Sequence, residues 1–128
     1  MSLRVVRLGT AREKGEGVRI GTVRRPPRGV PKAEFSSGNW YDVWYPNLAP
    51  SAELVKQALS AADAKEWAAF VRKYCAEMAA PEPSRTLDLL AVLSTSANFS
   101  VGCYCEDEAR CHRSILRTLL AERGAKVA

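Results

Sequence analysis

The hydrophobic and polar positions of the N-terminal part alternate over short distances, which is typical of strands. Residues 3–9 and 18–24 mix β-branched residues with single polar ones, and each predicts a short strand. Residues 25–31 contain three prolines, which lack the amide donor that a sheet requires, and they predict a stiff loop. An aromatic-rich stretch follows, in which residues 41–45 predict another short strand.

After Pro50 the hydrophobic residues recur at spacings of three and four, which is the period of helices. Ser51 can cap a first helix, and Asp63 with Glu66 forms a capping box for a second. We expect a third helix to begin at Ser84, after two prolines. Its inward-facing residues are predicted to be Leu87, Leu90, Ala91 and Leu93.

The C-terminal part predicts a strand followed by a helix. Residues 99–105 form a buried strand, and an acidic turn separates them from a helix over residues 111–123 that Gly124 can end. Helices and strands that alternate in this way indicate an α/β fold. We predict one domain over residues 1–128, a single compact domain whose short, mostly parallel sheet of about four strands is covered by helices.

Positive charge is concentrated near the N-terminus. The chain carries 19 Lys and Arg residues and 14 Asp and Glu residues, but residues 1–32 alone have a net charge of +7 and the rest have −2. Any anion-binding surface is therefore expected mainly from this first segment. No apolar run approaches the roughly 18 residues that span a bilayer, and Arg4 and Arg7 interrupt a signal-like segment. We predict a cytoplasmic protein with reduced thiols and no membrane partner.

Three of the four cysteines and the only histidine lie in residues 103–113. One interpretation is a zinc site, because sulfur and imidazole are preferred zinc ligands. The spacing lacks paired Cys-x2-Cys motifs, however, and the consecutive residues Cys111 and His112 would diverge by about 100° around a helix. The sequence therefore predicts no metal and no cofactor, although a Cys/His metal site stays open as an alternative.

A second interpretation makes Cys105 a nucleophile at the end of a strand, with His112 as general acid or base. The acids of residues 106–108 weaken it, because they repel anions and raise the pKa of a thiol. A third interpretation places His112 and Arg113 in the first turn of a helix, where they bind a ligand. In that case Glu106 is a candidate acceptor or general base. The structural alternative is that the cysteines are small buried hydrophobic residues.

The proline-rich loop supplies the second candidate site. Arg24 and Arg28 lie on or beside it, and Arg19 lies on the strand before it. Guanidinium groups on a stiff loop lose little entropy when they meet a phosphate. The neighbouring aromatic cluster could stack on bases, so a nucleic-acid or protein-binding module is an alternative. No recognition helix or zinc-finger spacing is visible, which disfavours nucleic acid as the partner.

Several segments together resemble the YeaO-like branch of the domain of unknown function 488 family. They are Gly17-Val-Arg19, Arg24, Pro27-Arg28-Gly29-Val30, Lys32, Trp44, Leu48-Ala49-Pro50-Ser51, Trp67, Phe70, Tyr74 and Glu77-Met78. The segments Cys105-Glu106 and Cys111-His112-Arg113 resemble the carboxyl-terminal signature of the broader family. The chain departs from that branch at Val23 and Pro26, where such members tend to have Asp and Trp. The resemblance implies a compact α/β domain, and it implies a site made of Arg19, Arg24, Arg28, Cys105, Glu106, Cys111, His112 and Arg113.

These observations lead to one working hypothesis. Both basic clusters follow the carboxyl end of a strand, so parallel pairing would bring them to the same edge of the sheet. We expect a small anionic, phosphate- or nucleotide-like ligand in a pocket there. Its binding residues would be Arg19, Arg24, Arg28, Cys111 and Arg113, and its candidate catalytic residues Cys105, His112 and Glu106.

Overall fold

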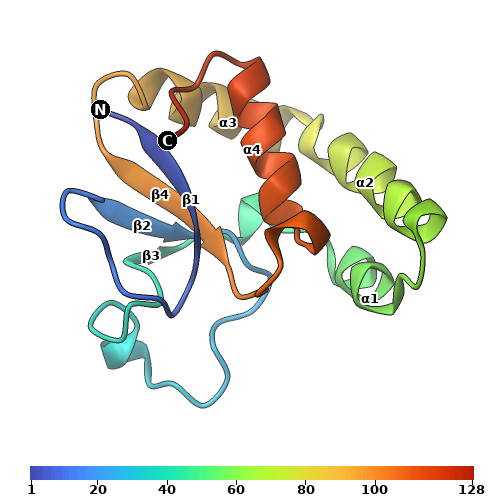
Figure 1. The fold of residues 1–128 in the computed structure, drawn as a ribbon, viewed down its shortest axis with the longest axis horizontal. Coiled ribbons are helices and arrows are strands. Elements are labelled where there is room, and N and C mark those ends of the chain that lie inside the picture. Colours follow the sequence, from blue (N-terminus) through green and yellow to red (C-terminus); the bar gives the residue numbers. More distant parts are fainter.

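The computed structural model describes all 128 residues and contains one parallel sheet with the strand order β1-β4-β2-β3 (Figure 1). The strands are β1 (Leu3–Arg7), β2 (Val18–Gly21), β3 (Val43–Trp44) and β4 (Phe99–Cys103). The helices are α1 (Ala52–Ser60), α2 (Ala64–Met78), α3 (Pro81–Leu93) and α4 (His112–Glu122). The predicted single α/β domain is confirmed, and all the paired strands are parallel.

The central strand β4 aligns its two neighbours. Phe99 lies opposite both Leu3 of β1 and Val18 of β2, so the three strands start in register. Because they run in the same direction, their carboxyl ends meet at one edge of the sheet. The outer edge of β1 is paired at its first residue by the C-terminal segment, since the Leu3 amide donates to the Lys126 carbonyl at 2.7 Å.

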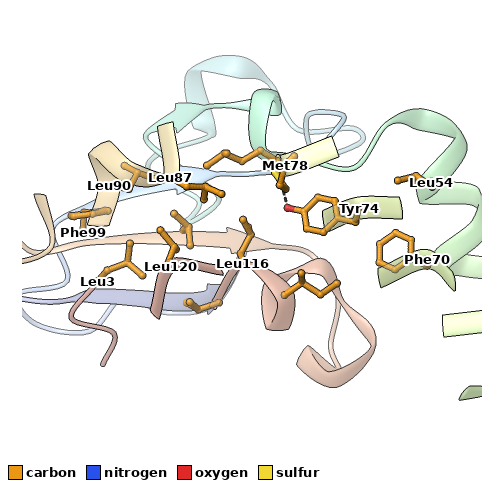
Figure 2. Packing of buried hydrophobic residues seen from close by; sticks show 14 residues of the cluster. Leu3, Leu54, Phe70, Tyr74, Met78, Leu87, Leu90, Phe99, Leu116 and Leu120 are labelled. Carbon is orange, nitrogen blue, oxygen red and sulfur yellow. Dashed lines mark hydrogen bonds between the residues drawn. The ribbon is translucent and has the colours of Figure 1, made fainter. Parts of the chain in front are cut away.

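The hydrophobic core lies between one face of the sheet and helices α2, α3 and α4 (Figure 2). Alternate residues of β1 and β4 point into it, as the period of two in a strand requires. The hydrophobic residues that recur at helical spacing after Pro50 face the core on α2, where Phe70, Tyr74 and Met78 are buried. The core residues are Leu3, Val5, Leu48, Leu54, Phe70, Tyr74, Met78, Leu87, Leu90, Phe99, Val101, Ile115, Leu116 and Leu120.

The predicted caps form at Ser51 and Asp63, whose side chains accept from the amides of Leu54 and Glu66. The capping box is shifted by one residue, because the Glu66 carboxylate accepts from the Ala62 amide rather than from that of Asp63. The predicted start of α3 is wrong, because the helix begins at Pro81 rather than Ser84. A proline in the first turn removes no helical hydrogen bond, since amides there have no partner within the helix. Leu93, predicted to face inward, is 40% exposed.

All four predicted strands are shorter in the structure, and β1 ends at Arg7 rather than residue 9. β2 ends at Gly21 rather than residue 24, and β4 ends at Cys103 rather than residue 105. The strand predicted over residues 41–45 contains only Val43 and Trp44. The segments that follow β2 and β4 are therefore loops at the sheet edge.

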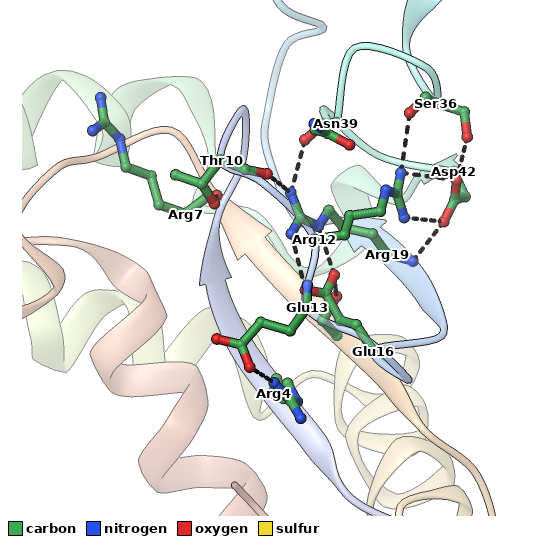
Figure 3. Close-up of polar contacts among 11 residues, drawn as sticks. Arg4, Arg7, Thr10, Arg12, Glu13, Glu16, Arg19, Ser36, Asn39 and Asp42 are labelled. Carbon is green, nitrogen blue, oxygen red and sulfur yellow. Dashed lines mark hydrogen bonds and ion pairs between the residues drawn. The ribbon is translucent and has the colours of Figure 1, made fainter.

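The other face of the sheet is held by a buried ion pair between Glu16 and Arg19 (Figure 3). The Arg19 guanidinium is fully buried and donates to the Glu16 carboxylate at 2.8 and 3.0 Å. It also donates to the carbonyls of Thr10 and Asn39, so one side chain holds two loops against the sheet. Burial raises the pKa of Glu16, but hydrogen bonds from Arg19 and Ser100 outweigh it and lower the pKa overall.

Asp42 holds the start of β3 in place. Its carboxylate accepts from the Arg12 guanidinium at 2.8 Å and from the Arg19 backbone amide at 2.8 Å, and the Ser36 hydroxyl adds a third donor (Figure 3). Burial raises the pKa of Asp42, but these three donors outweigh it and lower the pKa to about 2. The carboxylate is therefore charged at every pH above that value.

Replacement of Glu16 by Gln should lower the free energy of unfolding by about 3–5 kcal/mol, because it leaves the buried Arg19 charge without its counter-ion. Chemical denaturation at neutral pH measures the change. The matched control is Glu13→Gln, since Glu13 forms an exposed ion pair with Arg4, and such pairs contribute about 0–1 kcal/mol. Equal effects of the two variants would contradict the role assigned to Glu16.

Asp42→Asn should lower the free energy of unfolding at neutral pH by about 1–2 kcal/mol, because it removes the ion pair with Arg12. The loss is modest because that ion pair is partly exposed to solvent. The folded pKa of Asp42 lies below its unfolded value of about 3.9. Its stabilising contribution is therefore complete above pH ~4 and is lost as the pH falls through about 2. Denaturation midpoints of both proteins across this range should converge; a constant difference would contradict the assignment.

Candidate functional site

The carboxyl ends of β1, β2 and β4 open into a cleft with a volume of about 880 Å³. The proline-rich loop that follows β2 forms one wall, and α1 forms another. Residues that follow β4 and the first residue of α4 complete the lining. The cleft thus lies where parallel α/β sheets commonly bind ligands.

The charged residues that line this cleft are all cationic. Six basic side chains contribute to its walls, and no Asp or Glu does. The six are Arg7, Arg24, Arg25, Arg28, Lys56 and Arg110. Charges of one sign around a concave surface produce a local potential that attracts anions.

Some of these cations already have partners. Arg24 donates to the carbonyls of Pro46, Ala49 and Pro50 and so ties the loop to the start of α1. Arg7 donates to the Tyr104 carbonyl and pairs with the exposed Glu106 carboxylate at 3.6 Å. None of the chain's ion pairs involves Arg25, Arg28 or Lys56, which are exposed and remain free to meet a ligand.

The cleft also has an apolar side. Trp40 and Tyr104 both line it, and their rings meet edge to face with centroids 5.9 Å apart. The Tyr104 hydroxyl donates to the Arg25 carbonyl at 2.9 Å, which ties the loop to the end of β4. Val55 and Leu59 of α1 contribute further apolar surface. The cleft therefore has both a cationic and an apolar surface.

Three thiols and one imidazole gather at one end of the cleft. The Sγ atoms of Cys103 and Cys105 lie 3.7 Å apart. The Sγ atom of Cys111 lies 4.0 Å from Nδ1 of His112. The ligand atoms of Cys103, Cys111 and His112 all lie within 4.8 Å of one another.

His112 is held in a defined orientation. Its Nε2 atom lies 2.7 Å from the Thr22 carbonyl oxygen, which can only accept, so Nε2 carries the proton. A neutral His112 therefore directs the lone pair of Nδ1 toward Cys111. The Tyr74 ring packs against the imidazole with centroids 5.6 Å apart and helps to fix its plane.

The thiols differ in acidity. Hydrogen bonds from Cys103 and Cys105, assisted by His112, lower the pKa of Cys111. The hydrogen bond with Cys103 favours the Cys105 thiolate, but Cys111 and burial outweigh it, so the pKa of Cys105 is raised. Hydrogen bonds to Cys105 and Cys111 and burial raise the pKa of Cys103.

The expected divergence of Cys111 and His112 around a helix is wrong. α4 begins at His112, and Cys111 precedes it with an extended backbone (φ −133°, ψ 149°). Only His112 is helical, so the two side chains approach the same point. The difference of one residue at the helix start removes the geometric objection to a shared site.

The structure gathers some of the predicted site residues and separates others. Arg24, Arg28, Cys105, Cys111 and His112 line the cleft. Arg19 does not, because it is buried with Glu16. Arg113 is buried behind the cleft, where it donates to the Cys105 carbonyl at 2.7 Å while its Nε has no partner. Glu106 is exposed beside Arg7, outside the cleft lining.

Several lining residues of the cleft were not predicted from the sequence. Lys56 and Arg110 are isolated basic residues on α1 and on the turn before α4, and Arg7 ends β1. Arg7 could have been predicted, because it ends β1 and the carboxyl ends of parallel strands meet at one edge of the sheet. No sequence signal marks Lys56, because its position depends on how α1 packs against the loop.

The fold and the site define an α/β protein whose single parallel sheet carries a cationic cleft and a Cys/His cluster at its carboxyl edge. A family model described as the active DUF488-N3 subclade matches residues 3–124. The chain therefore belongs to the DUF488 family, and the family resemblance is confirmed. No curated protein and no solved structure matches the chain. None of its helices has the length and apolar character needed to cross a membrane.

Arg24→Ala and Arg28→Ala should differ in their effect on stability. Arg24→Ala removes donors to three carbonyls and should lower the free energy of unfolding by about 2–3 kcal/mol. Arg28 is exposed and forms no ion pair, so Arg28→Ala should leave the denaturation midpoint unchanged. Thermal and chemical denaturation of both variants measure this, and a loss of stability in Arg28→Ala would contradict the assignment of a free guanidinium.

Proposed function

We propose that the protein binds a small phosphate-bearing ligand with an aromatic part, of the nucleotide class, in the cleft at the carboxyl edge of the sheet. The observation that carries this proposal is the set of six basic residues around a cleft that no carboxylate lines. Phosphate groups would meet Arg25, Arg28 and Lys56, which have no counter-ion within the chain. Guanidinium groups offer paired donors that match phosphate oxygens.

The apolar wall supports a nucleotide rather than phosphate alone. Trp40 and Tyr104 lie in the same cleft as the free guanidinium groups and present aromatic surface for a base. The cleft volume of about 880 Å³ lies within the range of small-molecule sites. Its two kinds of surface would recognise the two ends of such a ligand.

The same arrangement gives less support to nucleic-acid binding. Tyr41 is buried, Tyr45 packs against the core, and the Trp44 indole donates to the Val23 carbonyl. The aromatic residues therefore do not form a row on which successive bases could stack. We assign the cleft to a small ligand and not to a polymer.

The proposal is limited to binding. His112 contacts Cys111 and Thr22 rather than Cys105, and the pKa of Cys105 is raised, which disfavours its thiolate. Glu106 points to solvent and to Arg7. No contact links Cys105, His112 and Glu106, so the structure gives no support to a joint catalytic role for these residues.

Calorimetric titration tests the proposal, with adenosine mono-, di- and triphosphate, adenosine and inorganic phosphate as probes. We expect nucleotides to bind more tightly than either phosphate or adenosine, and binding to weaken as salt is added. Arg28→Ala should lower the affinity about tenfold, because a charge-assisted hydrogen bond is lost. The matched control is Arg85→Ala, which removes the same charge from the exposed surface of α3.

Two outcomes would overturn the proposal. The first is that none of the probes binds at low ionic strength. The second is that Arg28→Ala and Arg85→Ala weaken binding equally, which would indicate a general effect of net charge. A short single-stranded oligonucleotide serves as a further probe; if it binds more tightly than any nucleotide, with a steep salt dependence, the site belongs to nucleic acid instead.

A further inference from the structure

Three side chains that can ligate a metal converge at the end of β4, with a fourth beside them, and the binding proposal does not use them. Cys103, Cys111 and His112 place their ligand atoms within 4.8 Å of one another. The sulfur of Cys105 lies 3.7 Å from that of Cys103 and adds a fourth candidate ligand. All four residues line the cleft, which gives an ion a path from solvent.

Two of the distances in the cluster are close to those of tetrahedral coordination. With Zn–S bonds of about 2.3 Å, two sulfurs of a regular tetrahedron lie about 3.8 Å apart. The Cys103 and Cys105 sulfurs are separated by 3.7 Å. A sulfur and an imidazole nitrogen on the same ion would be about 3.6 Å apart, and Cys111 Sγ and His112 Nδ1 are 4.0 Å apart. The ligand atoms of Cys103, Cys111 and His112 lie within 4.8 Å of one another, so these side chains would rotate to close around an ion.

The surroundings of His112 also match a metal ligand. A histidine that binds a metal donates its other ring N–H to a carbonyl or carboxylate, which fixes the tautomer and the plane of the ring. His112 does this through Nε2 and the Thr22 carbonyl at 2.7 Å. Its remaining nitrogen points at sulfur, a weak hydrogen-bonding partner, so a metal ion would replace weak contacts by strong ones.

We propose that Cys103, Cys105, Cys111 and His112 bind one Zn²⁺ ion as a Cys₃His site. Each thiol that coordinates the ion releases its proton to solvent, and His112 binds through the Nδ1 lone pair without releasing one. The ion would connect the end of β4 to the start of α4 and, through Thr22, to the segment after β2. This proposal does not depend on the nucleotide proposal, because Arg25, Arg28 and Lys56 are not ligands.

Two other states of the cluster compete with this proposal. Cys103 and Cys105 are close enough to be oxidised to a disulfide by an added oxidant, and the cluster could also remain a set of metal-free thiols. Neither state binds zinc at the cluster. The metal content of the full-length protein, prepared with reductant and without chelator, therefore distinguishes the zinc-bound cluster from both of these states.

Elemental analysis of that preparation should find about one equivalent of zinc. Removal of the metal with a chelator, followed by titration with Co²⁺, should give the visible bands of tetrahedral cobalt. It should also give a sulfur-to-cobalt charge-transfer band with the intensity expected of three thiolates. Zinc should displace the cobalt and abolish both signals, because zinc prefers this ligand set.

The variant Cys111→Ser should lower the zinc affinity at least about 100-fold, because loss of a ligand exceeds the 10–100-fold effect of a residue that only supports one. Its matched control is Cys75→Ser, which alters the remaining cysteine on α2 and should retain one equivalent of zinc. If Cys111→Ser does not fold, the cobalt spectrum of the wild-type protein still decides the question.

The proposal is overturned if the purified protein lacks zinc and its reduced apoprotein shows no cobalt–thiolate band. It is also overturned if Cys111→Ser retains zinc as tightly as Cys75→Ser does, or if a Cys103–Cys105 disulfide persists under reductant. Arg28→Ala should keep its zinc. Loss of nucleotide binding in that variant together with retained zinc would separate the two proposals.

Discussion

The parallel alignment of β4 between β1 and β2 is the constraint on which the rest of the structure depends. It brings Arg7, the segment after Gly21 and Cys103 to one edge of the sheet, although they lie far apart in the sequence. The cationic cleft, its aromatic wall and the thiol cluster all lie at this edge. The buried pair of Glu16 and Arg19 maintains the alignment from the opposite face, because it fixes the loops that connect these strands.

The elements that depend on local rules could be predicted from the sequence. The caps at Ser51 and Asp63, the buried stripe on α2 and the end of α4 at Gly124 follow from hydrogen bonding and periodicity over a few residues. The start of α3 could not, since a proline both ends helices and occupies their first turn. Which of the two occurs at Pro81 depends on how the previous helix ends.

The candidate site shows a different limit. The prediction that basic residues and the Cys/His segment meet at one edge needed only the direction of the strands. The role of each residue could be assigned only once its burial was known. Arg19 and Arg28 are equally basic in the sequence, but Arg19 forms a buried ion pair and Arg28 is exposed. The metal-ligand geometry depended on a single backbone conformation, that of Cys111, which periodicity cannot resolve.

The C-terminal segment has a consequence for association between molecules. Lys126 and Ala128 exchange backbone hydrogen bonds with Leu3, and Val127 lies beside it, so the outer edge of β1 has a partner. The opposite edge is β3, which is only two residues long. One outer strand is paired at its first residue and carries Arg4 and Arg7, and the other is very short, so the sheet offers little template for another strand. Partial pairing, positive charge and short length together protect the fold against edge-to-edge aggregation.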